Sequence, residues 1–345
     1  MSGERIDWYR TEMDRDTFRE LTRRSDARGL VQCLLQLAWV GVTGFAAYYA
    51  WHHWHWGAFL LVLFIHGSMM QFLGVTAACH ELSHGTPFRS RALGLFFYNL
   101  FSFISWNNPT WFRISHFEHH KYTTYALLDQ EVELPASFRA RDFLKSFLMA
   151  PAFWWQPPMR QITYSLGRLA SAWDEQIFPS SDPALRSSLF RWGRILLIGH
   201  VALAAMFLYI GEWVLIPIVL FPSYGGWFSN LYGGAQHMGL QSNVPDFRRC
   251  CRTMLLSRFE AFLYWQMNYH TEHHMYPGVP FFNGHKLHQL LQADGAPEPN
   301  HGVLDAWREM RMIQRQQRET PGVAFDAFSR GRQPVYVSQR AETDV

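Results

Sequence analysis

The sequence predicts an all-α integral membrane protein with four transmembrane helices in two hairpins and a cytosolic helical cap that carries a histidine-rich metal site. Three observations predict this fold class. Hydrophobic residues make up 48% of the chain and gather in runs of about 20, the length at which a helix crosses a bilayer core of about 30 Å. Fifteen tryptophans suit a chain with two membrane–water interfaces. Compact histidine clusters recur along the chain.

Each predicted hairpin consists of two apolar runs with almost no room between them. In the first, the connection is the six-residue segment WHHWHW. The four predicted spans are Gly29–Ala50, Gly57–Cys79, Ile195–Ile210 and Trp213–Tyr232. Two shorter apolar segments, 92–103 and 143–155, fall below the length of a span. We interpret them as re-entrant or interfacial helices, the second ending at the Pro157–Pro158 break.

Lysine and arginine determine the predicted orientation. Seven precede the first span, twelve lie between the hairpins, twelve follow the fourth span, and neither hairpin turn contains one. Because basic residues concentrate on the cytosolic side, both termini and the histidine clusters are expected there. The predicted regions are a cytosolic N-terminal segment (1–28), a membrane-embedded domain (29–293) and a cytosolic C-terminal tail (294–345). The charged tail either caps the site or is partly disordered.

Composition excludes several other classes of protein. The four cysteines have no paired spacing, so no disulfide scaffold or zinc knuckle is predicted. The mixed-charge N-terminus lacks the basic region and apolar core of a cleavable signal peptide. A net charge of +3, with arginines dispersed among acids, predicts no nucleic-acid partner.

Eight of the seventeen histidines fall in three boxes, HELSH, HFEHH and HTEHH. They are His80, His84, His116, His119, His120, His270, His273 and His274. Residues three and four apart share a helix face, with Cβ atoms about 5–6 Å apart, so each box can direct its imidazoles at one metal ion. Eight imidazoles exceed the coordination sphere of one metal. The pattern therefore predicts two metals, and imidazole suits Fe, Cu, Zn or Ni.

The boxes and their flanking residues resemble the membrane fatty acid desaturase and hydroxylase superfamily, in particular the acyl-lipid desaturases. The segments that carry the likeness are WFRISHFEHHKYTTYALLDQE and NYHTEHHMYPGVPFFNGHKLH, and it covers about residues 30 to 290. The resemblance implies a di-iron centre, O₂ as co-substrate, and His237 in GGAQHMG as a ninth ligand. The chain departs from the family at Gln236, where related enzymes often have an acidic residue.

Acidic residues in and beside the boxes are predicted to accept N–H bonds from ligand imidazoles, which orients the rings and raises their basicity. They are Glu81, Glu118, Asp129, Glu131 and Glu272. Asn268 is predicted to be either a similar partner or a helix cap. His66 shares a helix face with His80 but lies roughly 21 Å deeper. We interpret it as lining the deep end of a substrate tunnel, with a structural interhelical bond as the alternative. His285, His288 and His301 are assigned to the tail, without a metal.

The expected function is O₂-dependent desaturation of an aliphatic chain, in a fatty acyl lipid or an acyl thioester. Hydroxylation shares the first C–H abstraction, so a hydroxylase stays open, as does a small amino-acid-like or secondary-metabolite substrate. Two other classes fit nine clustered histidines less well. A zinc-dependent membrane hydrolase usually has three protein ligands per metal, and a metal transporter needs ligands distributed through the bilayer.

The resemblance also implies a separate electron donor, ferredoxin or cytochrome b5 with its reductase. The sequence has no His-Pro-Gly-Gly segment, no cysteine cluster and no GxGxxG motif. Arg248, Arg249 and Arg252 are predicted either to form a docking face for an acidic donor or to be a solvated or headgroup-binding face. We expect a multi-pass protein surrounded by membrane lipids, in a bacterial inner membrane rather than the endoplasmic reticulum.

Overall fold

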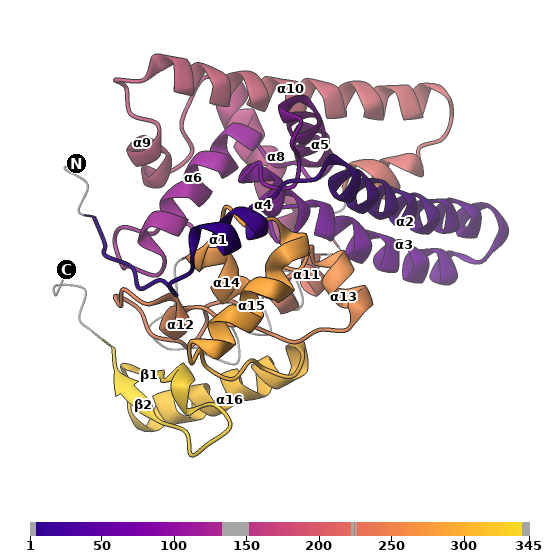
Figure 1. The fold of residues 1–345 in the computed structure, drawn as a ribbon. Coiled ribbons are helices and arrows are strands. Elements are labelled where there is room, and N and C mark those ends of the chain that lie inside the picture. The colour runs from indigo at the N-terminus through magenta and orange to yellow at the C-terminus, as the bar shows by residue number, and fades with distance from the viewer. Residues whose placement is uncertain (1–4, 133–151, 222–223, 225, 340–345) are drawn as a thin grey trace. The chain divides into compact units, whose positions relative to one another are not determined.

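The computed structural model describes residues 5–132, 152–221, 224 and 226–339 (Figure 1). The chain divides into two compact units. The first unit comprises Met1–Ser25, His116–Leu144 and Leu231–Val345, and the second comprises Asp26–Ser115 and Lys145–Asn230. Helix α6 (Pro109–Tyr122) begins in the second unit and ends in the first.

Three helical stretches among the described residues are long and apolar enough to cross a membrane. They are Arg15–His53, Trp56–Ser83 and Pro183–Tyr209. In the second unit, α2 (Asp26–His53) and α3 (Trp56–Met70) pack side by side as a hairpin (Figure 1). Large apolar side chains such as Phe45 on α2 and Ile198 on α10 (Pro183–Tyr209) are about two-thirds exposed, at 68% and 66%. Exposed apolar surface on long helices indicates that the chain associates with a membrane.

The second predicted span is interrupted before its end. Helix α3 stops at Met70 and is followed by the 3₁₀ turn η1 (Gln71–Leu73) and the short helix α4 (Ala78–Ser83). Gly74 separates η1 from α4 with extended backbone at φ −80° and ψ −160°. The third predicted span is part of a longer helix, because α10 already begins at Pro183, where Asp182 caps its first turn.

The prediction of a fourth continuous span is not confirmed. In place of one long helix, the described residues of 213–232 form the π-helical turn η2 (Ile216–Leu220) and the short helix α11 (Gly226–Gly233). Pro217 lies at the start of η2, and a proline has no backbone N–H to continue an α-helical ladder. The segment is apolar enough for a span, but Pro217 interrupts the α-helical hydrogen bonds that a continuous span needs.

The two short apolar segments have different outcomes. Residues 92–103 form α5 (Arg91–Ile104), a helix too short to span. Much of 143–155 lies outside the described residues, but α8 (Ala152–Ser165) runs through Pro157 and Pro158, so the predicted break there is wrong. Packing outweighs the proline penalty: α8 lies so close to α10 that a Cβ on Gly193 would come within 2.6 Å of the Tyr164 Cβ. The short helix α9 (Ala172–Ile177) follows.

The first unit contains short helices around a buried apolar cluster. They are α1 (Arg15–Leu21), α12 (Phe247–Cys250), α13 (Arg258–Leu263), α14 (His270–Met275) and α15 (Gly284–Ala293), with the 3₁₀ turn η4 (Phe281–Asn283) before α15. The cluster contains Leu21 from α1, Phe247 from α12, Met275 from α14 and Leu287 from α15. It fixes the distance between the N-terminal segment and the helix that carries the third histidine box.

The C-terminal tail is folded as far as residue 339. Helix α16 (Val303–Glu319) precedes strands β1 (Val323–Phe325) and β2 (Tyr336–Ser338), which pair antiparallel, with the 3₁₀ turn η5 (Ala327–Ser329) between them. The all-α prediction was therefore incomplete, and the alternative of a partly disordered tail does not hold for these residues. The strands form because Phe325 and its neighbours Leu240 and Ile313 make a small apolar core that the pair covers.

Candidate metal centre

The second histidine box lies on α6, whose start is fixed by Asn108. The Oδ1 atom of Asn108 accepts hydrogen bonds from the backbone N–H groups of Thr110 and Trp111, as an N-cap residue does. The helix continues through the box to Tyr122. Helical spacing therefore places the box histidines on neighbouring turns, as predicted.

The third box forms the helix α14, and all three of its histidines are buried. His237 lies in the turn after α11, followed by Gly239 with φ +81°. A Cβ on Gly239 would lie 2.9 Å from the Ile313 side chain on α16. Glycine is needed here for both the positive φ and the close approach of the tail helix.

Four histidines of the first unit converge on one point. We call His119, His237, His270 and His274 the His274 set, and their ligand atoms all lie within 4.8 Å of one another. The Nε2 atom of His270 lies 2.9 Å from Nε2 of His237 and 3.0 Å from Nε2 of His274. All four side chains are buried, with exposed fractions of 3% or less.

The Nδ1 atoms of three members of this set, His119, His237 and His274, are hydrogen-bonded on the far side of the rings. His237 donates from Nδ1 to the Cys250 carbonyl at 2.9 Å, and His119 donates to Asp129 at 2.8 Å. The Thr123 hydroxyl donates to the His119 carbonyl, so it accepts from Nδ1 of His274 at 3.0 Å. In a neutral ring whose proton is at Nδ1, Nε2 carries a lone pair, and in His237 and His274 it is directed at the common point.

Electrostatics keep two of these rings neutral. Burial, reinforced by neighbouring histidines, lowers the pKa of His237 to about 3 and that of His274 well below its ordinary value. Burial also lowers the pKa of His119, but the Asp129 carboxylate outweighs burial and the net pKa is raised. Burial raises the pKa of Asp129 while its bond with His119 lowers it, and the net pKa is lowered, so the carboxylate is ionised.

Three further histidines form a second group, which we call the His120 set: His116, His120 and His273. Nε2 of His120 lies 3.0 Å from Nε2 of His116 and 3.1 Å from Nε2 of His273. His116 donates from Nδ1 to Glu131 at 2.7 Å, which again leaves Nε2 with a lone pair. The rings of His120 and His274 lie 4.2 Å apart, so the two sets adjoin.

The donor chemistry of both sets fits metal ions. Facing lone pairs about 3 Å apart repel unless a proton or a cation lies between them, and in four of the seven rings Nδ1 is hydrogen-bonded away from the common point. Two nitrogens 2.9 Å apart can each lie about 2.1 Å from one ion, the usual metal–imidazole distance. Two adjoining sets of imidazole ligands fit two such ions better than one.

The first box lies in the second unit. His80 is on α4 and His84 is its C-cap residue, with the two rings 5.9 Å apart. The His80 ring also contacts Phe112, at a ring separation of 6.3 Å. That His80 and His84 bind the same metals as the other seven histidines stays a prediction from the motif.

The predicted polar partners divide into two groups. Asp129 and Glu131 each accept a hydrogen bond from a box histidine, as expected. Glu118 pairs with Lys121 and Glu272 accepts from Thr253 and His288, so neither contacts a box histidine in the described part of the chain. Glu81 accepts a bond from Thr86. Asn268 is not a cap of α14 and donates instead to the Met254 carbonyl.

Sequence reasoning missed three groups around the site. Thr123 orients His274, the Cys250 carbonyl orients His237, and His288 binds Glu272 at 2.6 Å. A signal existed only for Thr123, which lies four residues after His119 on the same helix face. The other two depend on contacts between distant segments, which no local pattern encodes.

His66 makes the structural bond that was the alternative to a tunnel role. Its ring bonds the Thr43 hydroxyl at 2.9 Å and the Ile218 carbonyl at 2.9 Å, which links α3 to α2 and to η2. A Cβ on Gly44 would come within 3.1 Å of this ring, so α2 approaches α3 closely here. The tunnel role stays a prediction.

The tail supports the His237 turn through a buried arginine. Arg252 was predicted to be part of a surface face, but its side chain is fully buried, so that prediction is wrong for this residue. It donates to Glu309 on α16 at 2.8 Å and to the carbonyls of Ala235 and Met238, which lie on either side of His237. Arg330 also binds Glu309. A charge pair from outside the boxes therefore holds this histidine's backbone.

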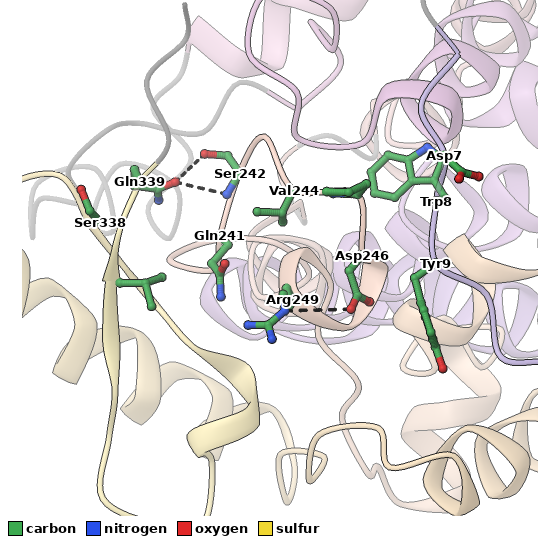
Figure 2. A pocket seen from close by; sticks show the side chains of 12 residues that line it. Asp7, Trp8, Tyr9, Gln241, Ser242, Val244, Asp246, Arg249, Ser338 and Gln339 are labelled. Atoms are coloured by element: carbon green, nitrogen blue, oxygen red, sulfur yellow. Dashed lines mark hydrogen bonds and ion pairs between the residues drawn. The ribbon is translucent and has the colours of Figure 1, made fainter. Parts of the chain in front are cut away.

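A polar surface pocket of the first unit lies between the N-terminal segment, the 241–249 segment and β2 (Figure 2). One wall is Trp8, whose ring stacks on Phe247 with centroids 4.0 Å apart. Phe247 in turn lies 5.7 Å from the ring of His274. The Trp8 indole N–H donates to the carbonyl of Lys121, the residue next to His120. Trp8 thus contacts the surroundings of both histidine sets.

A comparison with known proteins agrees with the site. The chain matches the fatty acid desaturase family over residues 54–304, well over half of its length. The matched range contains all three boxes and His237, and it ends at the start of α16. A search of curated proteins found no match. Family membership implies an oxidoreductase. The chain belongs to the fatty acid desaturase family.

Proposed function

We propose that the protein catalyses O₂-dependent desaturation of the aliphatic chain of a fatty acyl lipid or acyl thioester, at a di-iron centre held by histidines. The observation that carries this proposal is the convergence of Nε2 atoms in the two histidine sets, in which four of the seven rings are hydrogen-bonded at Nδ1 to Asp129, Glu131, Thr123 or a backbone carbonyl. Family membership supports iron as the metal.

When bound, two irons supply the O₂ chemistry that removes hydrogen from an unactivated C–H bond. The chain's own residues hold and orient the site. The His274 set and the His120 set provide seven imidazoles, and the motif assigns His80 and His84 as the remaining two. Asp129 and Glu131 fix the ring orientation of His119 and His116 and raise their basicity. Near-complete burial of His270 and His274 excludes bulk water from their side of the site.

The reaction consumes electrons that a separate donor supplies, and we propose ferredoxin or cytochrome b5 with its reductase. The stack of Trp8 on Phe247 beside His274 supports a route from the surface pocket to the histidine sets. Arg249 lies at this pocket and is 38% exposed; it pairs with Asp326 at 3.0 Å and Asp246 at 4.0 Å, and we propose that its exposed part contacts an acidic donor. The proposed orientation keeps both termini and this pocket on the cytosolic side.

Metal content of detergent-purified protein tests the proposal. We expect about two irons per chain by mass spectrometry, with a substantial loss in His119→Ala and none in His301→Ala, an exposed histidine of the tail. Protein with iron, O₂ and a reducing system should then convert an acyl substrate to an alkene. Zinc alone, unaffected by iron supply, would overturn the mechanism. An alcohol as the sole product would show that the protein is a hydroxylase rather than a desaturase.

A further inference from the structure

The second unit contains a pocket of about 620 Å³ that no step above uses. Residues from three parts of the chain line it: Val75 after η1, Asn107 and Trp111 at the start of α6, and Met159 and Arg160 from α8. Two of these elements continue into histidine boxes, since α4 follows Val75 and α6 carries the second box. The lining therefore belongs to segments that lead directly into the first and second histidine boxes in the sequence.

Asn107 has a buried donor that lacks a partner. Its side chain is 8% exposed, and its Nδ2 atom makes no hydrogen bond to any described residue. The thiol of Cys79 is close but is a weak acceptor. A buried donor left unpaired loses its hydrogen bond to water without gaining another, so such groups are rare and call for a ligand or water. By contrast, the neighbouring Asn108 donates to the Leu189 carbonyl at 3.0 Å and to Gln161.

The backbone beside Asn107 is held in a sparsely populated conformation. Trp106 has φ +56°, which is unfavourable for a bulky residue. Residues in such strained conformations are found mostly at functional sites. The ring of Trp106 is fixed by a 2.5 Å bond from Nε1 to the Leu220 carbonyl and by stacking on His200 at 3.8 Å. The turn that presents Asn107 to the pocket is therefore rigid.

Arg160 supplies a positive charge at the same pocket. Its guanidinium lies over the ring of Trp111, 4.0 Å from the centroid, which orients the planar group. It also forms an ion pair with the buried carboxylate of Asp174 at 3.7 Å, a distance beyond that of a hydrogen bond. That carboxylate already accepts bonds from Trp111 Nε1, the Tyr164 hydroxyl and the Ala170 N–H. Arg160 is thus held in place while keeping donors for an anion.

We propose that this pocket binds the anionic head group of an amphiphilic substrate, a carboxylate or a phosphate, through Asn107 Nδ2 and the Arg160 guanidinium. Guanidinium groups bind both anions through paired charge-assisted hydrogen bonds. The apolar wall of Val75, Trp106 and Met159 accommodates the start of the chain, and the exposed parts of Val75 and Met159 continue toward lipid. The proposal names the substrate class of the proposed desaturase and rests on that function.

Binding to metal-free protein in non-ionic detergent tests the proposal independently of iron. Trp106 and Trp111 line the pocket, so a brominated palmitate should quench tryptophan fluorescence on binding. We expect the methyl ester of the same chain to bind at least roughly tenfold more weakly, because it lacks the charge. Brominated phosphatidic acid is the second probe. Tight binding of palmitate alone identifies a carboxylate head group, and tight binding of phosphatidic acid alone identifies a phosphate. Either result, or tight binding of both, supports the proposal.

Variants then assign the effect to the pocket. Asn107→Leu and Arg160→Gln should each weaken binding of the anion about tenfold or more, and Arg160→Lys should restore part of it. The matched control is Arg168→Gln, which removes the same charge from an exposed position of the same unit outside the lining. Affinity for the ester equal to that for both anions, or an equal loss in Arg168→Gln, would overturn the proposal. Because no metal is present, these outcomes do not depend on the iron content that tests the desaturase function.

Discussion

Replacing Glu309 with glutamine removes the negative charge between the buried Arg252 and the partly buried Arg330. Glu309 accepts hydrogen bonds from Arg252 at 2.8 and 3.0 Å and from Arg330 at 2.5 and 3.2 Å. Burial raises the pKa of its carboxyl, but the two arginines outweigh burial and hold the pKa at about 2, against an ordinary value of 4.5. The charged form is therefore strongly favoured in the folded protein.

The magnitude follows from this shift. A carboxyl whose pKa falls from 4.5 to about 2 on folding stabilises the folded state at neutral pH by about 3 kcal/mol. Breaking a buried ion pair by removing one partner costs about 3–5 kcal/mol, because a charge is left uncompensated. The two estimates agree, so we expect Glu309→Gln to lower the free energy of unfolding by about 3 kcal/mol.

The assay is thermal unfolding of detergent-purified protein at pH 7, with iron content measured in parallel. Glu319→Gln, the same change at an exposed position of the same helix, is the control and should leave the unfolding temperature unchanged. Because Arg252 also binds the carbonyls on either side of His237, iron content should fall in Glu309→Gln as well. Equal unfolding temperatures in the two variants would refute the reasoning.

The same residue predicts a pH dependence. The folded pKa is lowered, so the stabilisation is fully present above the unfolded pKa of about 4.5 and is lost as pH falls toward about 2. The difference in stability between the wild type and Glu309→Gln should therefore be constant from pH 7 to about 5 and narrow below that. A difference that grows as the pH falls would contradict the assigned pKa.

Three further predictions concern the surroundings of the histidines. Asp129→Asn removes the carboxylate that orients His119 and should weaken metal binding about 10–100-fold in a chelator competition, whereas Glu118→Gln should not. Thr123→Val removes the acceptor for Nδ1 of His274 and should weaken metal binding in the same assay; an unchanged affinity would show that the ring needs no such bond. Gly239→Ala introduces strain at φ +81° and a contact with Ile313, so it should lower the unfolding temperature, and no change would exclude the tight approach of α16.

The sequence by itself determined the family of the protein and most of the histidines in its candidate metal centre. Three boxes with helical spacing are a local pattern, so the residues that share a face of α6 or α14 could be read directly, and Asp129 and Glu131 were found because they follow their box closely. Long apolar runs likewise predicted α2, α3 and α10, because membrane-length hydrophobicity is a property of one segment.

The tertiary structure alone decided what depends on distant segments or on backbone chemistry. Pro217 and Gly74 interrupt segments whose composition predicted continuous spans, while packing against α10 carries α8 through two prolines. Arg252 is buried against Glu309, and His66 bonds the Ile218 carbonyl; both partners lie far away in the chain. That the amide of Asn107 finds no partner can likewise be known only from the folded chain. The local spacing of residues predicts which face of a helix a side chain lies on. Which other segments contact that face is decided only by the packing of the whole chain.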